Sequence, residues 1–216
     1  MKNKSQVAVL SLLVVLLITV TATAQQKQDL ELTADELLID DANSKVTATG
    51  NVRFSQGDLK LTTDKLTTQE QLKFIEAEGN VVVKQQERTL TANNLKLNTE
   101  TEIGILTGNP KYQAPPVVIR GNRFNFNLKT GQLRVEEEVY LNNKQEDITA
   151  EADNLSYSNT GQEAVLTGDV VARKGDRRLT AQKMTIDLET NKIKAEGQTT
   201  LIVPNAKQKQ GDKNGD

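Results

Sequence analysis

Polar and apolar residues alternate along two kinds of run that recur through the chain. The shorter kind is represented by LTADELLIDD at 32–41 and the longer kind by KVTATGNVRF at 45–54. Short polar segments rich in Gly, Asn, Asp, Thr and Lys separate the runs. Strict alternation is typical of strands with one buried face and one wet face. The pattern therefore predicts strands joined by tight turns, with no helix outside the N-terminal apolar segment.

The two runs together form a repeat of about 29 residues, which is the most informative feature of the sequence. The repeated segments begin at Leu32, Leu61, Leu90, Ile119, Ala150 and Leu179, at offsets of 29, 29, 29, 31 and 29. Eighteen residues into these segments lie Gly50, Gly79, Gly108, Glu137, Gly168 and Gly197. We interpret the five glycines as inward-facing positions that leave space for a bend or for a close neighbour.

Every second residue of the longer runs is small or aliphatic, so these residues form an apolar stripe through the repeats. The stripe residues that we expect to line an apolar groove are Val46, Ala48, Val52, Phe54, Ile75, Ala77, Val81, Val83, Leu106, Leu133, Val135, Val139, Leu141, Leu166 and Val170. The shorter runs contribute a second apolar stripe. Near Asp35 and Glu36 its apolar residues no longer recur at every second position. That break predicts a β-bulge at these two residues and their equivalents.

The predicted fold is all-β: an elongated, twisted antiparallel β-jellyroll built from about six repeated strand pairs around an open apolar interior. A parallel solenoid with one repeat per coil is the rival architecture. Turns of two to five residues favour hairpins, because parallel pairing needs long crossovers. Prolines in the third repeat predict an edge, a bend or a break in pairing there.

The N-terminus predicts export from the cytoplasm. Two lysines precede an apolar run at 7–20, and Ala22-Thr23-Ala24 resembles a signal-peptidase site. The run of about 14 residues is shorter than the roughly 20 that span a bilayer, although an uncleaved inner-membrane anchor facing the periplasm stays an alternative. The predicted organisation is a signal peptide at 1–24, a short lead at 25–31, the β-jellyroll at 32–204 and a disordered polar tail at 205–216.

Charge and composition exclude several function classes. Without Lys2 and Lys4 the chain carries 25 basic against 29 acidic residues, so it lacks the basic surface that nucleic-acid binding needs. It contains no cysteine and no histidine, which removes disulfides, thiolate metal sites and the commonest general base.

No arrangement of residues predicts catalysis, a metal site or a cofactor. Adjacent acidic residues such as Glu136, Glu137 and Glu138 alternate between the two faces of a strand, so they do not present paired carboxylates. Glu137 occupies the glycine register, where it lies either at a bulge or at an open mouth of the fold. The repeated Asp35, Asp64 and Asp153 suggest either calcium or local capping of exposed N–H groups. We expect no enzyme activity.

The repeated phrases resemble a known family. TADELLIDDANSKVTATGNVRFSQGDLKLTTDKL, and again EADNLSYSNTGQEAVLTGDVVARKGDRRLTAQKM from Glu151 to Met184, are similar to the pattern of LptA/OstA-type lipopolysaccharide-transport proteins. The resemblance extends from about Leu32 to Val203. It departs from the pattern at 119–147, which lacks the Gly-Asn-Val phrase, and at Ala114-Pro115-Pro116.

The resemblance implies a periplasmic protein that shelters the acyl chains of lipopolysaccharide and bridges the two membranes for outer-membrane biogenesis. It implies lipopolysaccharide and the other export components at the inner and outer membranes as partners. It also implies a head-to-tail homo-oligomer through the edge strands at 32–54 and 179–203. An anchored LptC-like component and a structural β-repeat surface protein without lipid stay open as alternatives.

Overall fold

A computed structural model of the chain describes residues 29–158, 160–187, 189–190 and 192–204. The predicted signal peptide, most of the short lead and the predicted polar tail lie outside the described residues. The first strand begins at Leu30, two residues before the predicted start of the β domain. In the part of the chain that the structure describes, no helix is long and apolar enough to cross a membrane.

Sixteen strands, all paired antiparallel, form one sheet in this structure. They are β1 (Leu30–Thr33), β2 (Glu36–Asp40), β3 (Lys45–Gln56), β4 (Leu59–Gln69), β5 (Phe74–Gln85), β6 (Arg88–Asn98), β7 (Ile103–Thr107), β8 (Lys111–Ala114), β9 (Val117–Arg120), β10 (Arg123–Asn127), β11 (Gln132–Asn143), β12 (Ile148–Ser158), β13 (Glu163–Lys174), β14 (Arg177–Asp187), β15 (Lys192–Glu196) and β16 (Thr200–Ile202).

The sixteen strands correspond to twelve longer runs, four of which are interrupted near their middle. The interrupted runs are β1 with β2, β7 with β8, β9 with β10, and β15 with β16, and each pair of short strands shares neighbouring long strands. Twelve runs are six strand pairs, so the predicted all-β antiparallel jellyroll is confirmed. The proline prediction is also confirmed, because Pro110 lies in the break between β7 and β8.

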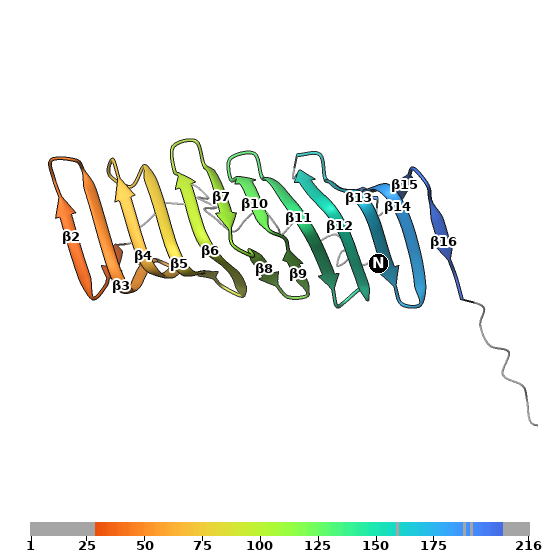
Figure 1. The fold of residues 1–216 in the computed structure, drawn as a ribbon, viewed down its shortest axis with the longest axis horizontal. Coiled ribbons are helices and arrows are strands. Elements are labelled where there is room, and N and C mark those ends of the chain that lie inside the picture. Colours follow the sequence, from red (N-terminus) through yellow and green to blue (C-terminus); the bar gives the residue numbers. More distant parts are fainter. Residues whose placement is uncertain (1–28, 159, 188, 191, 205–216) are drawn as a thin grey trace, which may run out of the picture.

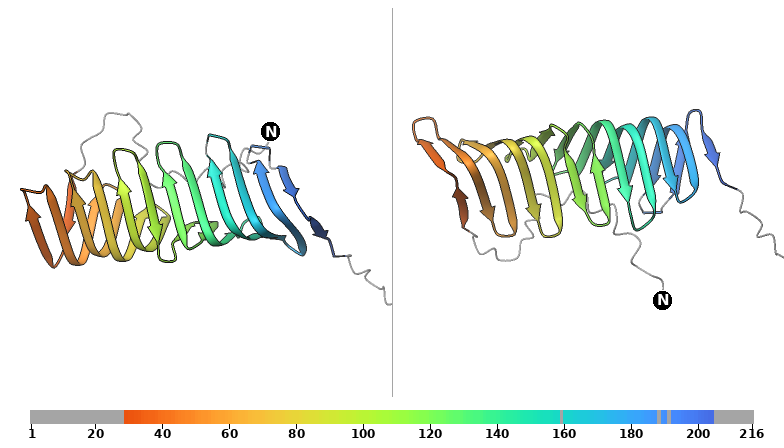
Figure 2. Two further views of the ribbon diagram at one scale, coloured as in Figure 1. Left: turned by 45° about the horizontal axis from the view of Figure 1, so that its top comes forward. Right: turned by 60° about the horizontal axis from the view of Figure 1, so that its bottom comes forward.

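The molecule is elongated, with β2 at one end and β16 at the other (Figure 1). The strands run across the long axis and curve as they cross it (Figure 2). Each strand pairs mainly with the strands next to it in sequence. Position along the molecule therefore follows position along the chain.

Each long strand changes register once with its neighbour, and that irregularity divides it into two arms. Between β3 and β4, Thr49 pairs with Lys65 and Val52 pairs with Thr63, so Gly50 and Asn51 together face Asp64 alone. The same two-against-one arrangement recurs between β5 and β6, β11 and β12, and β13 and β14. Bulges of this kind bend a strand.

One hydrophobic cluster, from Ala48 to Met184, fills the inside of the bend along the molecule. It consists mainly of aliphatic side chains from the inward faces of the long strands, as period-two alternation predicts. Its continuity follows from the repeat, because every unit presents the same apolar positions to the same side.

Candidate functional site

The structure places the predicted groove residues on the inward face of the sheet. Twelve of the fifteen are buried, and Val46, Phe54 and Ile75 are half-buried. All except Val46 belong to the hydrophobic cluster or pack against it.

An apolar cavity of about 60 Å³ lies within this interior. Its lining residues are Phe54, Leu59, Leu61, Leu66, Thr68, Ile75, Val83, Leu90, Leu95, Leu97, Leu106 and Phe126. Leu61 and Leu66 belong to the same strand on opposite sides of Asp64, where the strand bends. Because both line the cavity, the cavity lies between the two arms of the bent strands.

Four of the predicted groove residues, Phe54, Ile75, Val83 and Leu106, line this cavity. The other eleven, including those in β11 and β13, do not line it. Sequence reasoning did not assign Leu59, Thr68, Leu97 or Phe126 to the groove. Each of the four lies two residues before or after an apolar residue of the shorter runs, so it shares the inward face with that residue. Extending the second stripe by one step of the alternation would have found all four.

The cavity in the interior is an apolar, uncharged space. The cavity lining contains no ionisable side chain, and Thr68 is its one polar residue. Burial raises the pKa of the Tyr112 phenol to about 12 against the opposing charge of Arg88, and burial also raises the pKa of Tyr157. Both shifts have the sign expected when an apolar environment disfavours the phenolate.

The glycines lie at the bends and make room for a close neighbour, as interpreted, but that neighbour is an exposed polar side chain, so their predicted inward-facing position is corrected. Gly50 and Gly79 have φ values of 75° and 77°, where side chains are disfavoured. A Cβ on Gly50 would collide with Asp35, and a Cβ on Gly79 would collide with Asp64. Gly108, Gly168 and Gly197 likewise have positive φ and face Asn93, Asp153 and Gln182. Each glycine makes room for a polar side chain of the neighbouring strand.

The predicted bulge at Asp35 and Glu36 is also corrected, because the extra residue lies on the glycine strand. The acidic side chain opposite the bulge accepts a hydrogen bond from the asparagine that follows the glycine. Asn51 Nδ2 donates to Asp35 Oδ2 at 2.8 Å, and Asn80 Nδ2 donates to Asp64 Oδ2 at 2.9 Å.

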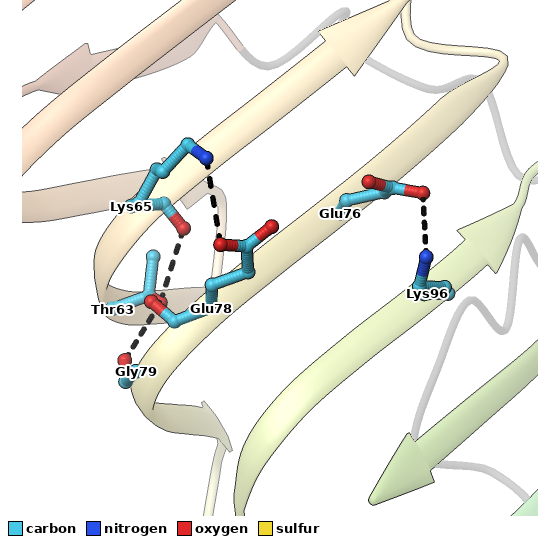
Figure 3. Close-up of polar contacts among 6 residues, drawn as sticks. All are labelled: Thr63, Lys65, Glu76, Glu78, Gly79 and Lys96. Atoms are coloured by element: carbon cyan, nitrogen blue, oxygen red, sulfur yellow. Dashed lines mark hydrogen bonds and ion pairs between the residues drawn. The ribbon is translucent and has the colours of Figure 1, made fainter.

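The bulge of β5 is stabilised from β4 by Thr63 (Figure 3). The Thr63 hydroxyl lies 2.8 Å from the carbonyl oxygen of Glu78 and 2.9 Å from that of Gly79, and it shares its one proton between these two acceptors. Thr63 is almost fully buried, so these bonds satisfy carbonyl groups at a place where the ladder is interrupted.

The acidic residues take local structural positions. Glu137 is exposed at φ 61° in the bulge of β11, which is the first of its two predicted places. Asp35 and Asp64 accept hydrogen bonds from the side chains of Asn51 and Asn80. Among the described residues, no group of three or more acidic side chains is arranged to hold a metal ion.

The two ends of the sheet expose apolar side chains. At the first end these are Leu30, Leu37, Leu38 and Ile39, and at the last end Ile193, Leu201, Ile202 and Val203. Except for Val203, which follows β16, these residues lie on strands that have a neighbour on one side in the described sheet. Unpaired edges of this kind can add a further strand.

Comparison with known proteins identifies one family and several similar solved structures. The family described as "LptA/(LptD N-terminal domain) LPS transport protein" matches residues 31–132 and 147–215. The gap between the matched ranges falls in the irregular fourth repeat. A search of curated proteins finds no match.

The crystal structure of LptH from Pseudomonas aeruginosa, described as the LptA-homologous periplasmic component of the lipopolysaccharide transport device, is among the similar solved structures. It is 12% identical over 85% of this chain and 100% of that chain, with a TM-score of 0.26.

Proposed function

The chain belongs to the LptA and LptD N-terminal-domain family of lipopolysaccharide transport proteins, and from that membership we propose that it carries lipopolysaccharide through the periplasm. In this proposal the acyl chains occupy the apolar interior between the arms of the bent strands. Copies of the protein, together with other export components, connect the inner and outer membranes.

The observation that supports lipid binding is the cavity between the arms, set within a continuous apolar cluster. Each methylene moved from water into such a space is worth about 0.8 kcal/mol. An acyl chain of about 12 carbons therefore gains on the order of 10 kcal/mol from burial. A path lined by apolar side chains lowers the free-energy barrier for an acyl chain to cross the aqueous space. Such a path needs no catalytic group.

The cavity as it stands is too small for an acyl chain. Its volume is about 60 Å³, whereas an engineered cavity that binds one benzene molecule has about 150 Å³. The arms must therefore separate when a chain enters. In the described sheet, strand pairing joins neighbours along the sheet, and the two arms meet through apolar side chains. Separation can thus leave the ladder hydrogen bonds intact.

Photo-crosslinking tests the lipid proposal. A photoreactive phenylalanine analogue at Phe54, a half-buried ring that lines the cavity, should crosslink to lipopolysaccharide. The matched control is the same analogue at Arg53, the next residue, which is exposed on the other face. Equal crosslinking at both positions, or crosslinking at neither, rejects the groove.

The two ends of the sheet also support head-to-tail association of copies. Residues 29–41 contain six acidic residues and no basic residue, whereas 177–204 contain five basic and three acidic residues. Opposite charges at the two ends favour one docking orientation. Two different surfaces that bind each other generate an open chain of subunits rather than a closed dimer.

The location of the protein is the remaining part of the proposal. Cleavage after Ala24 gives a soluble periplasmic protein that begins at Gln25, and retention of the apolar run gives an anchored component instead. N-terminal sequencing of the exported protein distinguishes the two. Recovery of a chain that begins at Met1 contradicts the soluble carrier.

A further inference from the structure

The end of β5 carries a glutamine whose carboxamide oxygen is buried and unpaired. Gln85 is the last residue of β5 and is half-buried. Among the described residues, Gln85 Oε1 is the one buried side-chain oxygen or nitrogen atom without a hydrogen-bond partner. Removal of a carbonyl oxygen from water is unfavourable unless another donor replaces the water. The Gln85 oxygen therefore needs a donor that the fold itself does not supply.

The other half of the carboxamide fixes its orientation. Gln85 Nε2 donates to Asp58 Oδ1 at 3.2 Å, and Asp58 lies in the turn before β4. In the reversed orientation the amide oxygen would meet the carboxylate, and two acceptors repel each other. The NH₂ group of Gln85 therefore faces Asp58, and its Oε1 atom faces away from that carboxylate.

Gln85 lies beside the apolar cavity. It follows Val83 by one step of the alternation, and exposed Lys84 separates the two, so both belong to the inward face. Leu59 is directly opposite Gln85 on β4, and side chains paired in this way have Cβ atoms about 5 Å apart. Val83 and Leu59 both line the cavity. The carboxamide therefore lies at the edge of the cavity, on the side of the β5–β6 turn.

Equivalent residues of two other repeats provide no such acceptor. Gln56 ends β3 and is exposed, so water reaches its amide. Asn143 ends β11 and is buried, but its Oδ1 atom accepts from the backbone N–H groups of Gln145 and Glu146, at 3.1 and 3.2 Å. The Asn143 oxygen thus caps its own turn, whereas the Gln85 oxygen does not. The unpaired acceptor occurs where the sheet contains the cavity.

An apolar cavity with one buried acceptor at its edge favours a particular ligand chemistry. A carboxamide oxygen accepts from a hydroxyl group or an amide N–H, and it repels an anionic oxygen. A site built to bond a donor discriminates against an analogue that lacks the donor, because the acceptor then stays unpaired. Since Gln85 lies next to the turn, the matching ligand is a hydrocarbon chain with a hydroxyl or N–H near its head end.

We propose that Gln85 Oε1 accepts a hydrogen bond from a hydroxyl group or amide N–H at the head end of an acyl chain that enters the cavity. Gln85 is then a specificity-determining residue, through which the site prefers a hydroxylated or amide-linked chain to a plain one. This inference rests on the proposed function, since it requires an acyl chain in the interior.

The test compares three uncharged probes of equal chain length: methyl tetradecanoate, methyl 3-hydroxytetradecanoate and N-methyl tetradecanamide. Their dissociation constants are measured on the exported chain by displacement of a fluorescent apolar dye. The variant is Gln85→Leu, which removes the acceptor and keeps an apolar side chain of similar size. Gln56→Leu is the matched control, because Gln56 occupies the equivalent place in the first repeat and is exposed.

We expect wild-type protein and Gln56→Leu to bind the hydroxylated ester, the amide or both about fivefold more tightly than the plain ester, as one hydrogen bond implies. A preference for one of the two donors identifies the group that Gln85 recognises. Gln85→Leu should bind all three probes about equally, with no loss of affinity for the plain ester. A side chain that only supported the fold would change all three affinities together.

Equal binding of the three probes to wild type overturns the role of Gln85 and leaves the lipid proposal standing. A preference that Gln85→Leu retains, or that Gln56→Leu loses to the same extent, also overturns it. Failure of all three probes to bind wild type overturns the lipid proposal, and this inference with it. If Gln85→Leu does not fold, Gln85→Met, which keeps an unbranched side chain, serves as the variant.

Discussion

At the scale of single residues, the bend of each strand depends on a polar side chain that sits over a glycine of the neighbouring strand. The glycines of five repeats have φ between 75° and 90°. Glu137 adopts φ 61° in the equivalent place of the fourth repeat. The same backbone geometry is therefore imposed by the sheet whichever residue is present, and glycine adopts it at the lowest cost.

Replacement of one of these glycines should destabilise the protein. We expect Gly79→Ala to lower the free energy of unfolding by about 1–2 kcal/mol, because an L-residue is disfavoured at positive φ and its Cβ would collide with Asp64. Urea denaturation followed by circular dichroism measures the change.

Gly161→Ala is the control for this prediction, since Gly161 has no positive φ and its added Cβ would meet Ser158 at an ordinary 3.5 Å. The double variant Asp64→Ala/Gly79→Ala should recover part of the loss. Equal effects of Gly79→Ala and Gly161→Ala contradict the explanation.

Burial of Tyr112 makes the free energy of unfolding depend on pH in the alkaline range. The pKa of Tyr112 is raised by burial from 10.0 to about 12, so the folded state holds the phenol proton more tightly than the unfolded state. The contribution, about 2–3 kcal/mol, is fully present below pH 10 and is lost as the pH rises towards 12.

Denaturation at pH 8 and at successive values up to pH 12 tests this prediction. The difference in unfolding free energy between wild type and Tyr112→Phe should change across that window, because phenylalanine has no proton to lose. A constant difference shows that the Tyr112 phenol does not carry the dependence.

At the scale of elements, the interrupted strands are of two kinds. β7 to β10 occupy the middle of the sheet, where the sequence departs from its repeat and Pro110 interrupts the ladder. β1 with β2, and β15 with β16, instead occupy the two ends. These end strands have an unpaired edge and exposed apolar side chains, a combination that normally leads to association.

A charge on an end strand should weaken association between copies. We expect Ile202→Asp on β16 to reduce the self-association constant by at least about tenfold, because a buried, unpaired carboxylate costs several kcal/mol. Sedimentation velocity over a range of protein concentrations measures the constant.

Ile103→Asp is a matched control for the end strand, because Ile103 and Ile202 are both 49% exposed and Ile103 lies at the start of central strand β7. Association that is unaffected by Ile202→Asp, or equally weakened by Ile103→Asp, places the contact elsewhere.

At the scale of the whole molecule, the order of strands in the sheet follows the order of the sequence. Each repeat therefore packs mainly on its neighbours, as in repeat proteins, whose stability is close to a sum of local terms. In the part of the chain that the structure describes, no late strand completes an early one.

A shortened chain should consequently fold. We expect residues 29–158, which end with β12, to keep the β-type circular dichroism spectrum and to unfold cooperatively about 5–10 °C below the full chain. A chain that ends at Val135, inside β11, is the control because it removes Tyr140–Asn143, the β11 residues that pair with β9. A disordered spectrum for residues 29–158 contradicts the local nature of the fold.

The sequence did not reveal which strand carries the bulge. The error arose because the inward-facing residues on either side of the bulge remain an even number of positions apart. Gly50 and Asn51 occupy one place in the ladder, yet Ala48 and Val52 remain an even number of residues apart. The glycine strand therefore looks regular, and Gly50 looks inward-facing. The partner strand shows the break in alternation instead, between Thr63 and Leu66, although it does not contain the extra residue.

The sequence by itself determined the strands, their antiparallel pairing, the repeat and the inward face, because alternation and turn residues are local properties of the chain. The tertiary structure decided where space remains between side chains. Phe54 and Phe126 line one cavity although 72 positions separate them in sequence, and residues of five strands, β7 and β10 to β13, line a second hollow. Such places depend on how bent arms meet and how twisted strands stack, which no local pattern of residues specifies.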